Sequence, residues 1–260
     1  MGNDRPTRAV VLAGAAHLSA ALAWAAAVQA TGAVVPLILI ERRSIATRLA
    51  LMRRRLTQHG ALTVAGQLLY FAWVADHGAA QDAAASHPAL SPMPSVHTLP
   101  DINAAPAAVH IRAASPTLAA VYGTSVIRGD TLAALPSDSF NLHTGLLRYH
   151  RGIACTFWAL ADGHPERIGV TIHRLSAGID AGVPVAERVL GMDALAGTDS
   201  MRRVDAAVER SGEELMRDVL VRAARADVKT EQSTAGALGP LHTAPTLREY
   251  WRVTRRFKLR

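Results

Sequence analysis

Residues 9–40 read AVVLAGAAHLSAALAWAAAVQATGAVVPLILI and contain no Asp, Glu, Lys or Arg. The stretch divides into a β-like run at 10–12, a helix-like run at 17–30 and a second β-like run at 34–40. Strands buried in a parallel sheet are continuous apolar runs of this kind, because helices cover both faces of the sheet. The stretch therefore predicts the strand–helix–strand unit that opens an α/β domain.

The same stretch has two membrane interpretations. Arg5 and Arg8 precede it and Val28-Gln29-Ala30 is cleavage-like, as in a secretory signal peptide. A transmembrane helix is the other alternative. Polar residues and helix breakers interrupt the run, namely Gly14, His17, Ser19, Gln29, Thr31, Gly32 and Pro36. We therefore favour the globular interpretation and expect a soluble cytoplasmic protein that makes no membrane contact.

Strand and helix signals alternate along the rest of the chain, which predicts a mostly parallel sheet. Ser44 is suited to cap a helix that ends before Gly60. We expect helices at 44–58, 61–76, 130–135, 156–162 and 198–224, the last capped by Thr198, and strands at 107–111, 118–122, 139–142, 170–173 and 183–189. The Pro- and Ala-rich stretch 78–106 is expected to be a long loop.

Composition bounds the function only loosely. The 260 residues carry a formal net charge of +7, with basic clusters at 42–55 and 248–260. A basic surface suits phosphate esters, folates, nucleic acids or acidic lipids, and the alternative is an Arg-rich composition without any binding role. Cys155 is the single cysteine, which excludes an intrachain disulfide and a Cys-based metal site. We interpret it as a packing residue.

Two segments carry candidate chemistry. Asn141 and His143 are two residues apart on a predicted strand, so their side chains share one face. Downstream, GVTIHRLSAGIDAGVPV at 169–185 is a strand followed by a loop that presents Asp180 between Gly178 and Gly182. Ligands of open α/β sheets bind at the carboxyl ends of the strands. We expect the two segments to meet there.

Together these segments resemble the formyltransferase family, whose members use 10-formyltetrahydrofolate as co-substrate. The family signature has an Asn-x-His pair, a following Arg-Gly and a Gly-x-Asp-x-Gly loop, which here are 141–143, 151–152 and 178–182. The stretch VYGTSVIRGDTL at 121–132 is similar to the family segment before the catalytic strand. The resemblance implies a Rossmann-like formyltransferase fold. We divide the chain into a catalytic domain at 1–190 and a C-terminal helix with a basic tail at 191–260.

The resemblance also implies roles for individual residues. The catalytic residues would be Asn141, His143 and Asp180. The folate donor would contact Tyr122, Gly123, Thr124, Ser125, Val126, Ile127, Gly178, Ile179 and Gly182, and the acceptor amine would contact Tyr149, Arg151 and Gly152. Formyl transfer passes through a tetrahedral oxyanion that an amide and an imidazole can stabilise. His143 or Asp180 could take the amine proton, and a carboxylate beside the imidazole favours its protonated form.

No metal is expected, because the histidines lack metal-ligand spacing. Departures from the family pattern are Arg148 in place of Pro, Ala181 in place of Thr, and Arg128-Gly129 in place of Lys-Pro. They leave the acceptor open. About 75 residues follow Val185, too few for a tRNA-binding domain in addition to the long helix, so no nucleic-acid partner is expected.

The first loop also lacks the phosphate-gripping glycines of purine-pathway members. An amino sugar, usually nucleotide-linked, or a natural-product amine is therefore the expected small-molecule acceptor. A homodimer is left open. The alternatives are a hydrolase that releases formate from the folate and a non-catalytic scaffold of the same fold.

Overall fold

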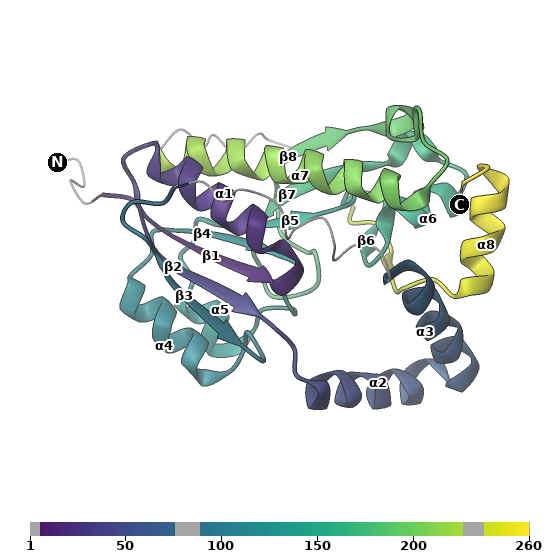
Figure 1. The fold of residues 1–260 in the computed structure, drawn as a ribbon, viewed down its shortest axis with the longest axis horizontal. Coiled ribbons are helices and arrows are strands. Elements are labelled where there is room, and N and C mark those ends of the chain that lie inside the picture. The colour runs from purple at the N-terminus through teal and green to yellow at the C-terminus, as the bar shows by residue number, and fades with distance from the viewer. Residues whose placement is uncertain (1–5, 76–88, 226–236, 260) are drawn as a thin grey trace.

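The computed structural model describes residues 6–75, 89–225 and 237–259. Its centre is a seven-stranded sheet of order β3-β2-β1-β4-β5-β7-β8 (Figure 1). The strands are β1 Arg8–Gly14, β2 Val34–Glu41, β3 Ser95–Leu99, β4 Leu118–Tyr122, β5 Ser139–His143, β7 Gly169–Arg174 and β8 Pro184–Val189. The first five in this order pair in parallel, and β7 and β8 continue the sheet antiparallel. The predicted α/β class with a mostly parallel sheet is confirmed.

The N-terminal strand–helix–strand unit forms as predicted. β1 and β2 pair in parallel, and α1, Leu18–Gln29, connects them across one face of the sheet. Trp24 of α1 is buried and donates its indole N–H to the Glu213 carbonyl of α7, Met201–Ala224, at 2.9 Å. None of the described helices is both long and apolar enough to cross a membrane.

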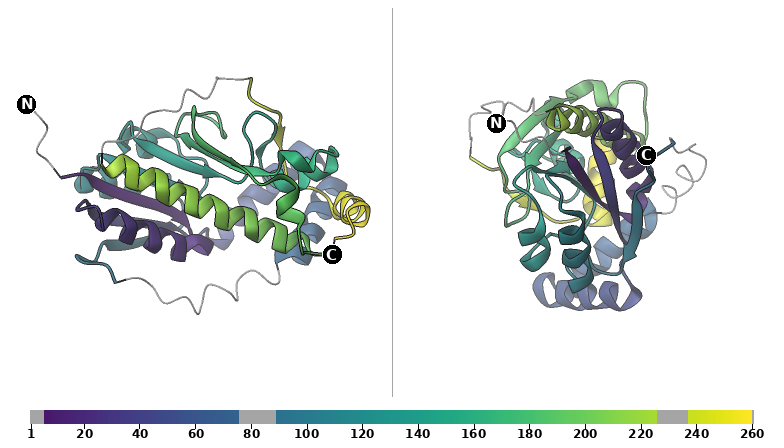
Figure 2. Two further views of the ribbon diagram at one scale, coloured as in Figure 1. Left: turned by 90° about the horizontal axis from the view of Figure 1, so that it is seen from above. Right: turned by 90° about the vertical axis from the view of Figure 1, so that its left-hand side faces the viewer.

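Helices cover both faces of the sheet (Figure 2). α1 and α7 lie on one face, and α7 buries residues at helical spacing, among them Val204, Val208, Leu215 and Val219 as predicted. α4, Ala105–Ala114, and α5, Gly129–Ala134, cover the other face around a second apolar cluster. The helix cap is Ser200 rather than the expected Thr198. The division of the chain near residue 190 stays a prediction.

Two expectations between 78 and 114 are wrong. The expected loop at 78–106 contains the edge strand β3, which pairs with β2 alone and buries none of its five side chains fully. It therefore lacks the apolar run that marks a central strand. The expected strand at 107–111 lies in α4, which buries positions 107, 108, 111 and 114 at helical spacing. Residues 78–88 of the expected loop lie outside the described part.

A helical hairpin stands beyond the carboxyl ends of β1 and β2. It consists of α2, Ile45–His59, and α3, Ala61–Ala75. Ser44 caps α2 as predicted, accepting a hydrogen bond from the Thr47 amide at 3.1 Å, and Gly60 ends it with a φ of +76°. α3 packs against α8, Leu247–Arg256 (Figure 1), with the rings of Tyr70 and Tyr250 5.4 Å apart.

The C-terminal segment returns to the middle of the molecule and pairs with a loop. β9, Leu241–His242, forms a two-stranded sheet with β6, Arg151–Gly152. Three backbone hydrogen bonds fix the pairing: Gly239 to Leu147, Arg151 to Pro240 and Ile153 to His242, at 2.8, 3.0 and 3.1 Å. We call residues 239–244 the C-terminal strap. The strap holds the loop that follows β5.

Glu41, the last residue of β2, organises the loop after β4. Its buried carboxylate accepts hydrogen bonds from the Ile102 amide at 3.2 Å, the Ser125 hydroxyl at 2.7 Å and the Ser125 amide. Arg43 lies 3.7 Å from the same carboxylate and donates to the Ser125 hydroxyl at 3.1 Å. A buried charge requires such partners. The carboxylate thereby ties the 123–127 loop to β2.

We predict that Glu41→Ala lowers the melting temperature, because it leaves the Ile102 and Ser125 donors without an acceptor. Each unsatisfied buried donor costs about 1–3 kcal/mol. Thermal unfolding followed by circular dichroism measures the effect. Glu214→Ala is the control, since Glu214 pairs with Arg188 at 3.2 Å on the surface, where an ion pair contributes at most about 1 kcal/mol. Equal melting temperatures for both variants would contradict the role of Glu41.

Candidate active site

The three expected catalytic side chains meet at the end of β5. Asn141 and His143 lie on this strand, and Asp180 lies in the loop between β7 and β8. The Nδ1 atom of His143 is 3.3 Å from Oδ2 of Asp180. β7 runs antiparallel to β5 and ends with Arg174 opposite Phe140, and the loop that follows returns to place Asp180 beside His143 and the Gly152 amide.

His173 joins the two halves of the site, and the sequence analysis did not assign it a role. It pairs directly with Asn141 in the β5–β7 register. Its Nε2 atom is 3.0 Å from Nδ2 of Asn141 and 3.7 Å from Oδ1 of Asp180. The signal for it was its position on the strand just before the Asp180 loop. A contact between His173 and Asn141 can be inferred from that position only once β7 is known to pair antiparallel with β5.

The hydrogen bonds of His173 orient the Asn141 amide. Its Nδ1 atom lies 2.9 Å from the Arg174 carbonyl oxygen, which can only accept. Nδ1 therefore carries the proton, and the Nε2 of the neutral ring accepts a hydrogen bond from Asn141. An amide nitrogen has two N–H groups, so the second N–H of Asn141 stays available to a ligand.

The Asp180 loop depends on its glycines. Asp180 has a φ of +47°, in the left-handed region that Asp tolerates better than most residues. A Cβ atom on Gly182 would lie 1.6 Å from the Arg174 carbonyl oxygen, so no side chain fits there. Asp180 also accepts a hydrogen bond from the Gly152 amide at 2.9 Å. The carboxylate is thus fixed from both sides.

The electrostatics of the site are set by burial and by Asp180. Burial raises the pKa of Asp180, but the neighbouring His173 and His143 and the Gly152 amide outweigh it, so the pKa lies below its ordinary value. Burial lowers the pKa of His143, and this outweighs the opposite effects of Asp180 and the His150 carbonyl. Asp180 favours the protonated form of His143 as expected, but burial has the larger effect, so near neutral pH the site pairs a carboxylate with a neutral imidazole.

The expected acceptor-binding residues connect loops to one another. Arg151 donates to the Gly239 carbonyl at 2.8 Å and to the Ile179 carbonyl at 3.3 Å. Gly152 has a φ of +90°, and a Cβ atom there would lie 2.3 Å from the His242 oxygen. The guanidinium groups of Arg148 and Arg167 lie over the Tyr149 ring. Contact of Tyr149, Arg151 and Gly152 with an acceptor stays a prediction.

The expected donor-binding residues lie on two loops, with Tyr122 at the end of β4. Residues 123–127 follow β4, and residues 178–182 follow β7. The side chains of Val126 and Ile179 are exposed, as a ligand contact requires, whereas those of Tyr122 and Ile127 are buried. These two residues could contact a ligand only through their backbone atoms. Donor binding by any of these residues stays a prediction.

A second histidine pair lies behind the site. Nδ1 of His150 is 3.2 Å from Nε2 of His242 on the strap, and within the described residues Nε2 of His150 has no hydrogen-bond partner. Burial and the neighbouring His242 lower the pKa of His150 to about 4, against the opposite effect of Asp162. Cys155 lies 3.4 Å from Nε2 of His143, and burial raises the pKa of its thiol, which fits the packing role expected for it.

We predict that acid destabilises the protein partly through His150. Its pKa is about 4 when folded and 6.5 ordinarily, so between these values the unfolded chain binds more protons. Stability is therefore present above about pH 6.5 and is lost as the pH falls towards 4. His150→Gln should reduce the fall in melting temperature between pH 7 and 4.5, by on the order of 5 °C.

His164→Gln is the matched control for this measurement, because His164 pairs with Glu166 at 2.7 Å near the surface. Its pH profile should follow that of the wild type. A His150→Gln profile parallel to the wild type would contradict the assignment.

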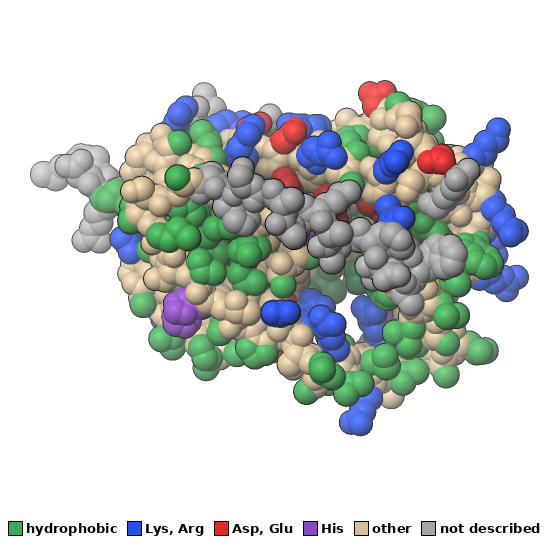
Figure 3. Space-filling model, in the orientation of Figure 1, with side chains coloured by type: hydrophobic (Ala, Val, Ile, Leu, Met, Phe, Trp, Pro, Cys, Tyr) green, Lys and Arg blue, Asp and Glu red, His purple; other side chains and the backbone are tan. Residues whose placement is uncertain are grey.

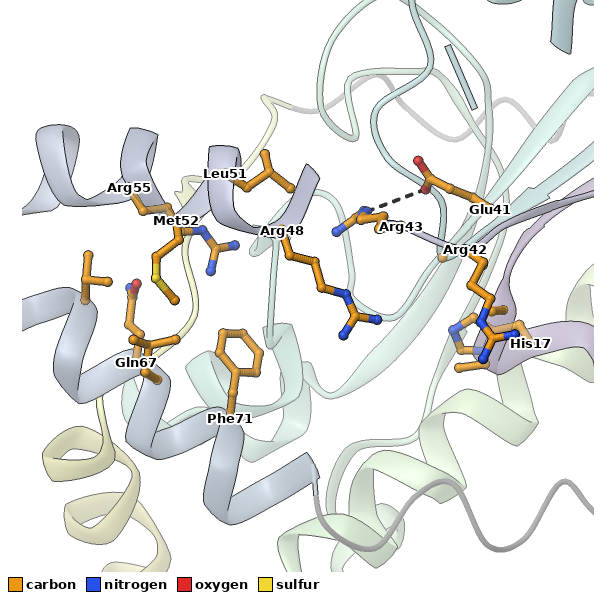
Figure 4. A pocket seen from close by; sticks show the side chains of 16 residues that line it. His17, Glu41, Arg42, Arg43, Arg48, Leu51, Met52, Arg55, Gln67 and Phe71 are labelled. Atoms are coloured by element: carbon orange, nitrogen blue, oxygen red, sulfur yellow. Dashed lines mark ion pairs between the residues drawn. The ribbon is translucent and has the colours of Figure 1, made fainter. Parts of the chain in front are cut away.

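A small cavity adjoins the site, and a larger one lies beside it. The larger, of about 600 Å³, lies between α2, α3 and the ends of β1 and β2 (Figure 4). The smaller, of about 180 Å³, is bordered by Thr144 and Cys155 next to His143 and by Asp205 and Glu209 of α7. Phe71 lines both. Burial and the nearby Glu209 raise the pKa of Asp205 to about 7. Neither cavity could be predicted from the sequence, because the residues that line each one are far apart in the chain.

The described residues include no group of three or more His, Cys, Asp or Glu side chains that could hold a metal ion. The polar groups of the site are instead an amide, two imidazoles and a carboxylate. Such groups can donate to a developing oxyanion and accept a proton. The arrangement is suited to acid–base chemistry on a carbonyl group.

Comparisons with known proteins agree with this assignment of the fold. A glycinamide ribonucleotide transformylase from Symbiobacterium toebii superposes with a TM-score of 0.58 at 17% identity, over 91% of this chain and 95% of that one. A sugar N-formyltransferase from a Shewanella species gives 0.58 at 12% identity, over 95% and 86%. A 4-N formyltransferase from Francisella tularensis gives 0.54 at 12% identity, over 90% and 75%.

The sequence itself also matches. Residues 95–220, from β3 into α7, match the model of the formyl transferase family. Both Asn141 and Asp180 fall inside this range. The resemblance to the formyl transferase family that the sequence predicted is thus confirmed over these residues.

Proposed function

We propose that the protein transfers a formyl group from 10-formyltetrahydrofolate to a primary amine of a small acceptor. The observation that carries the proposal is the linked group of Asn141, His173, Asp180 and His143, with contacts of 3.0 to 3.7 Å. This group stands at the end of β5, next to the Asp180 loop and the Gly152 amide. The acceptor is an amino sugar, nucleotide-linked or otherwise, or a natural-product amine.

Each side chain has a role in the proposed reaction. The amine attacks the formyl carbon, and negative charge develops on the formyl oxygen. The free N–H of Asn141 donates to that oxygen, which is usually a large contribution to such catalysis. The neutral imidazole of His143, beside the ionised Asp180, helps to take the proton that the amine loses, directly or through water. The leaving folate nitrogen receives a proton in turn, so the overall transfer balances.

We predict that Asn141→Ala loses most of the formyl-transfer rate while the protein still folds. Removal of one oxyanion donor costs on the order of 100- to 1,000-fold. His143→Ala should have a comparable effect. The assay offers amino sugars and small amines with the formyl donor and detects the mass gain of one formyl group. Near-normal turnover in either purified variant would remove these residues from the mechanism.

We predict that Asp180→Asn lowers kcat on the order of 100-fold and changes folate affinity only modestly. Asn fits the φ of +47° and keeps the shape, but it removes the charge beside His143. Turnover and donor titration on this variant measure the two effects separately.

Asp138→Asn is the control for Asp180→Asn, because Asp138 pairs with Arg174 at 2.7 Å on the surface. It should leave turnover unchanged. An Asp180→Asn enzyme as active as this control would mean that Asp180 is only a turn residue. The assay also separates the alternatives: formate release without an amine identifies a hydrolase, and the absence of both products identifies a scaffold.

A further inference from the structure

The 600 Å³ cavity is strongly basic. Its lining includes Arg42 and Arg43 from the end of β2, and Arg48 and Arg55 from α2, with Glu41 as the one carboxylate. Figure 4 shows Arg48 and Arg55 reaching from α2 into the cavity, and Arg42 beside His17 on the opposite side. In Figure 3, Lys and Arg side chains gather around the hollow between the sheet and α2. Positive charge therefore converges on one space from two structural elements.

Most of this charge has no internal counterion. Glu41 is engaged by Arg43 and Ser125. Within residues 6–75, 89–225 and 237–259, Arg42, Arg48 and Arg55 make no ion pair with a carboxylate. Like charges that face a common hollow repel one another, and a bound anion would remove this repulsion. The arginines that face the cavity therefore leave its positive charge largely unbalanced within the described residues.

The remaining walls are apolar. Leu51, Met52, Leu68 and Phe71 line the cavity together with the arginines, and the Arg55 guanidinium lies 5.9 Å from the Phe71 ring centroid. Arginine recognises phosphate oxygens through paired hydrogen bonds. An apolar wall beside such a group suits a ring that stacks or packs. The cavity thus fits an anionic group attached to a flat or apolar body.

We propose that this cavity binds a soluble diphosphate ester, which is the anionic part of the formyl acceptor. The inference rests on the proposed function and narrows its acceptor class. The carboxylate tail of the folate donor is the competing anion. Of the residues expected to bind the donor, however, only Gly123 lines the cavity.

The smaller cavity indicates how an acceptor bound in the basic cavity would be oriented. It shares Phe71 with the basic cavity and extends to Thr144 and Cys155, next to His143. Asp205 and Glu209 line this end, so the two cavities have opposite charge. An acceptor with its diphosphate among the arginines would direct its amine towards the acidic end and His143.

The test measures the affinity of pyrophosphate and of uridine diphosphate for the full chain by titration calorimetry. Both should bind the wild type saturably. The double variant Arg48→Gln with Arg55→Gln should raise the dissociation constant of each at least about tenfold. The matched control is Arg53→Gln with Arg54→Gln, on the same helix but outside the cavity lining. It loses the same net charge and should bind as the wild type does.

Three results would overturn the inference: no saturable binding to the wild type, equal loss in both double variants, or displacement of pyrophosphate by phosphatidylglycerol vesicles and not by uridine diphosphate. A higher KM for the folate donor in Arg48→Gln with Arg55→Gln would also overturn it, since the arginines would then serve the donor.

The inference and the proposed function can fail separately. Asn141→Ala should bind uridine diphosphate as tightly as the wild type, because Asn141 is not part of the cavity lining. Diphosphate binding that depends on Arg48 and Arg55, without formylation of any amine, would contradict the proposed function and support the anion site. Formyl transfer without any diphosphate binding would contradict the anion site alone.

Discussion

A half-buried, ionised Asp180 is the constraint on which the rest of the site depends. A carboxylate removed from water is costly unless charged or hydrogen-bonding groups surround it. Here His143 comes from β5, His173 from β7 and the Gly152 amide from the β6 loop. Each partner belongs to a different segment, so the segments must meet for the carboxylate to remain charged. The loop glycines, the antiparallel β7 and the strap all serve this one contact.

Glu41, at the end of β2, orders a second loop in the same way. It is also a buried carboxylate at a strand end, and it fixes the loop after β4 through Ser125. The two carboxylates thus order the two loops between which the donor is proposed to bind. Glu41 also faces the basic cavity, where it pairs with Arg43, while Arg42, Arg48 and Arg55 make no ion pair with a carboxylate among the described residues. One residue therefore couples the geometry of one loop to the charge of the neighbouring cavity.

The sequence predicted those parts of the fold in which local pattern and burial agree. The apolar runs at 10–12 and 34–40 and the amphipathic spacing at Val204 and Val208 are of this kind. The edge strand β3 was missed because its side chains are largely exposed, and α4 was taken for a strand because a short apolar run does not reveal its period. Asn141, His143 and Asp180 were found through a motif. His173 and the two cavities depend on strand register and on segments distant in the chain, which no local pattern contains.

Because the strap holds a loop of the site, the site can be completed only after residues 239–244 have been synthesised. Arg151 is bound by Gly239, 88 residues later in the chain, and His150 by His242, 92 residues later. Contacts of such long sequence separation form late, because the intervening chain must first be ordered. On the ribosome, the sheet and both carboxylates can already be in place while the loop beside them is still open. Closure of the loop therefore waits for the C-terminal strap, and a nascent chain holds the parts of the site before it holds their final arrangement.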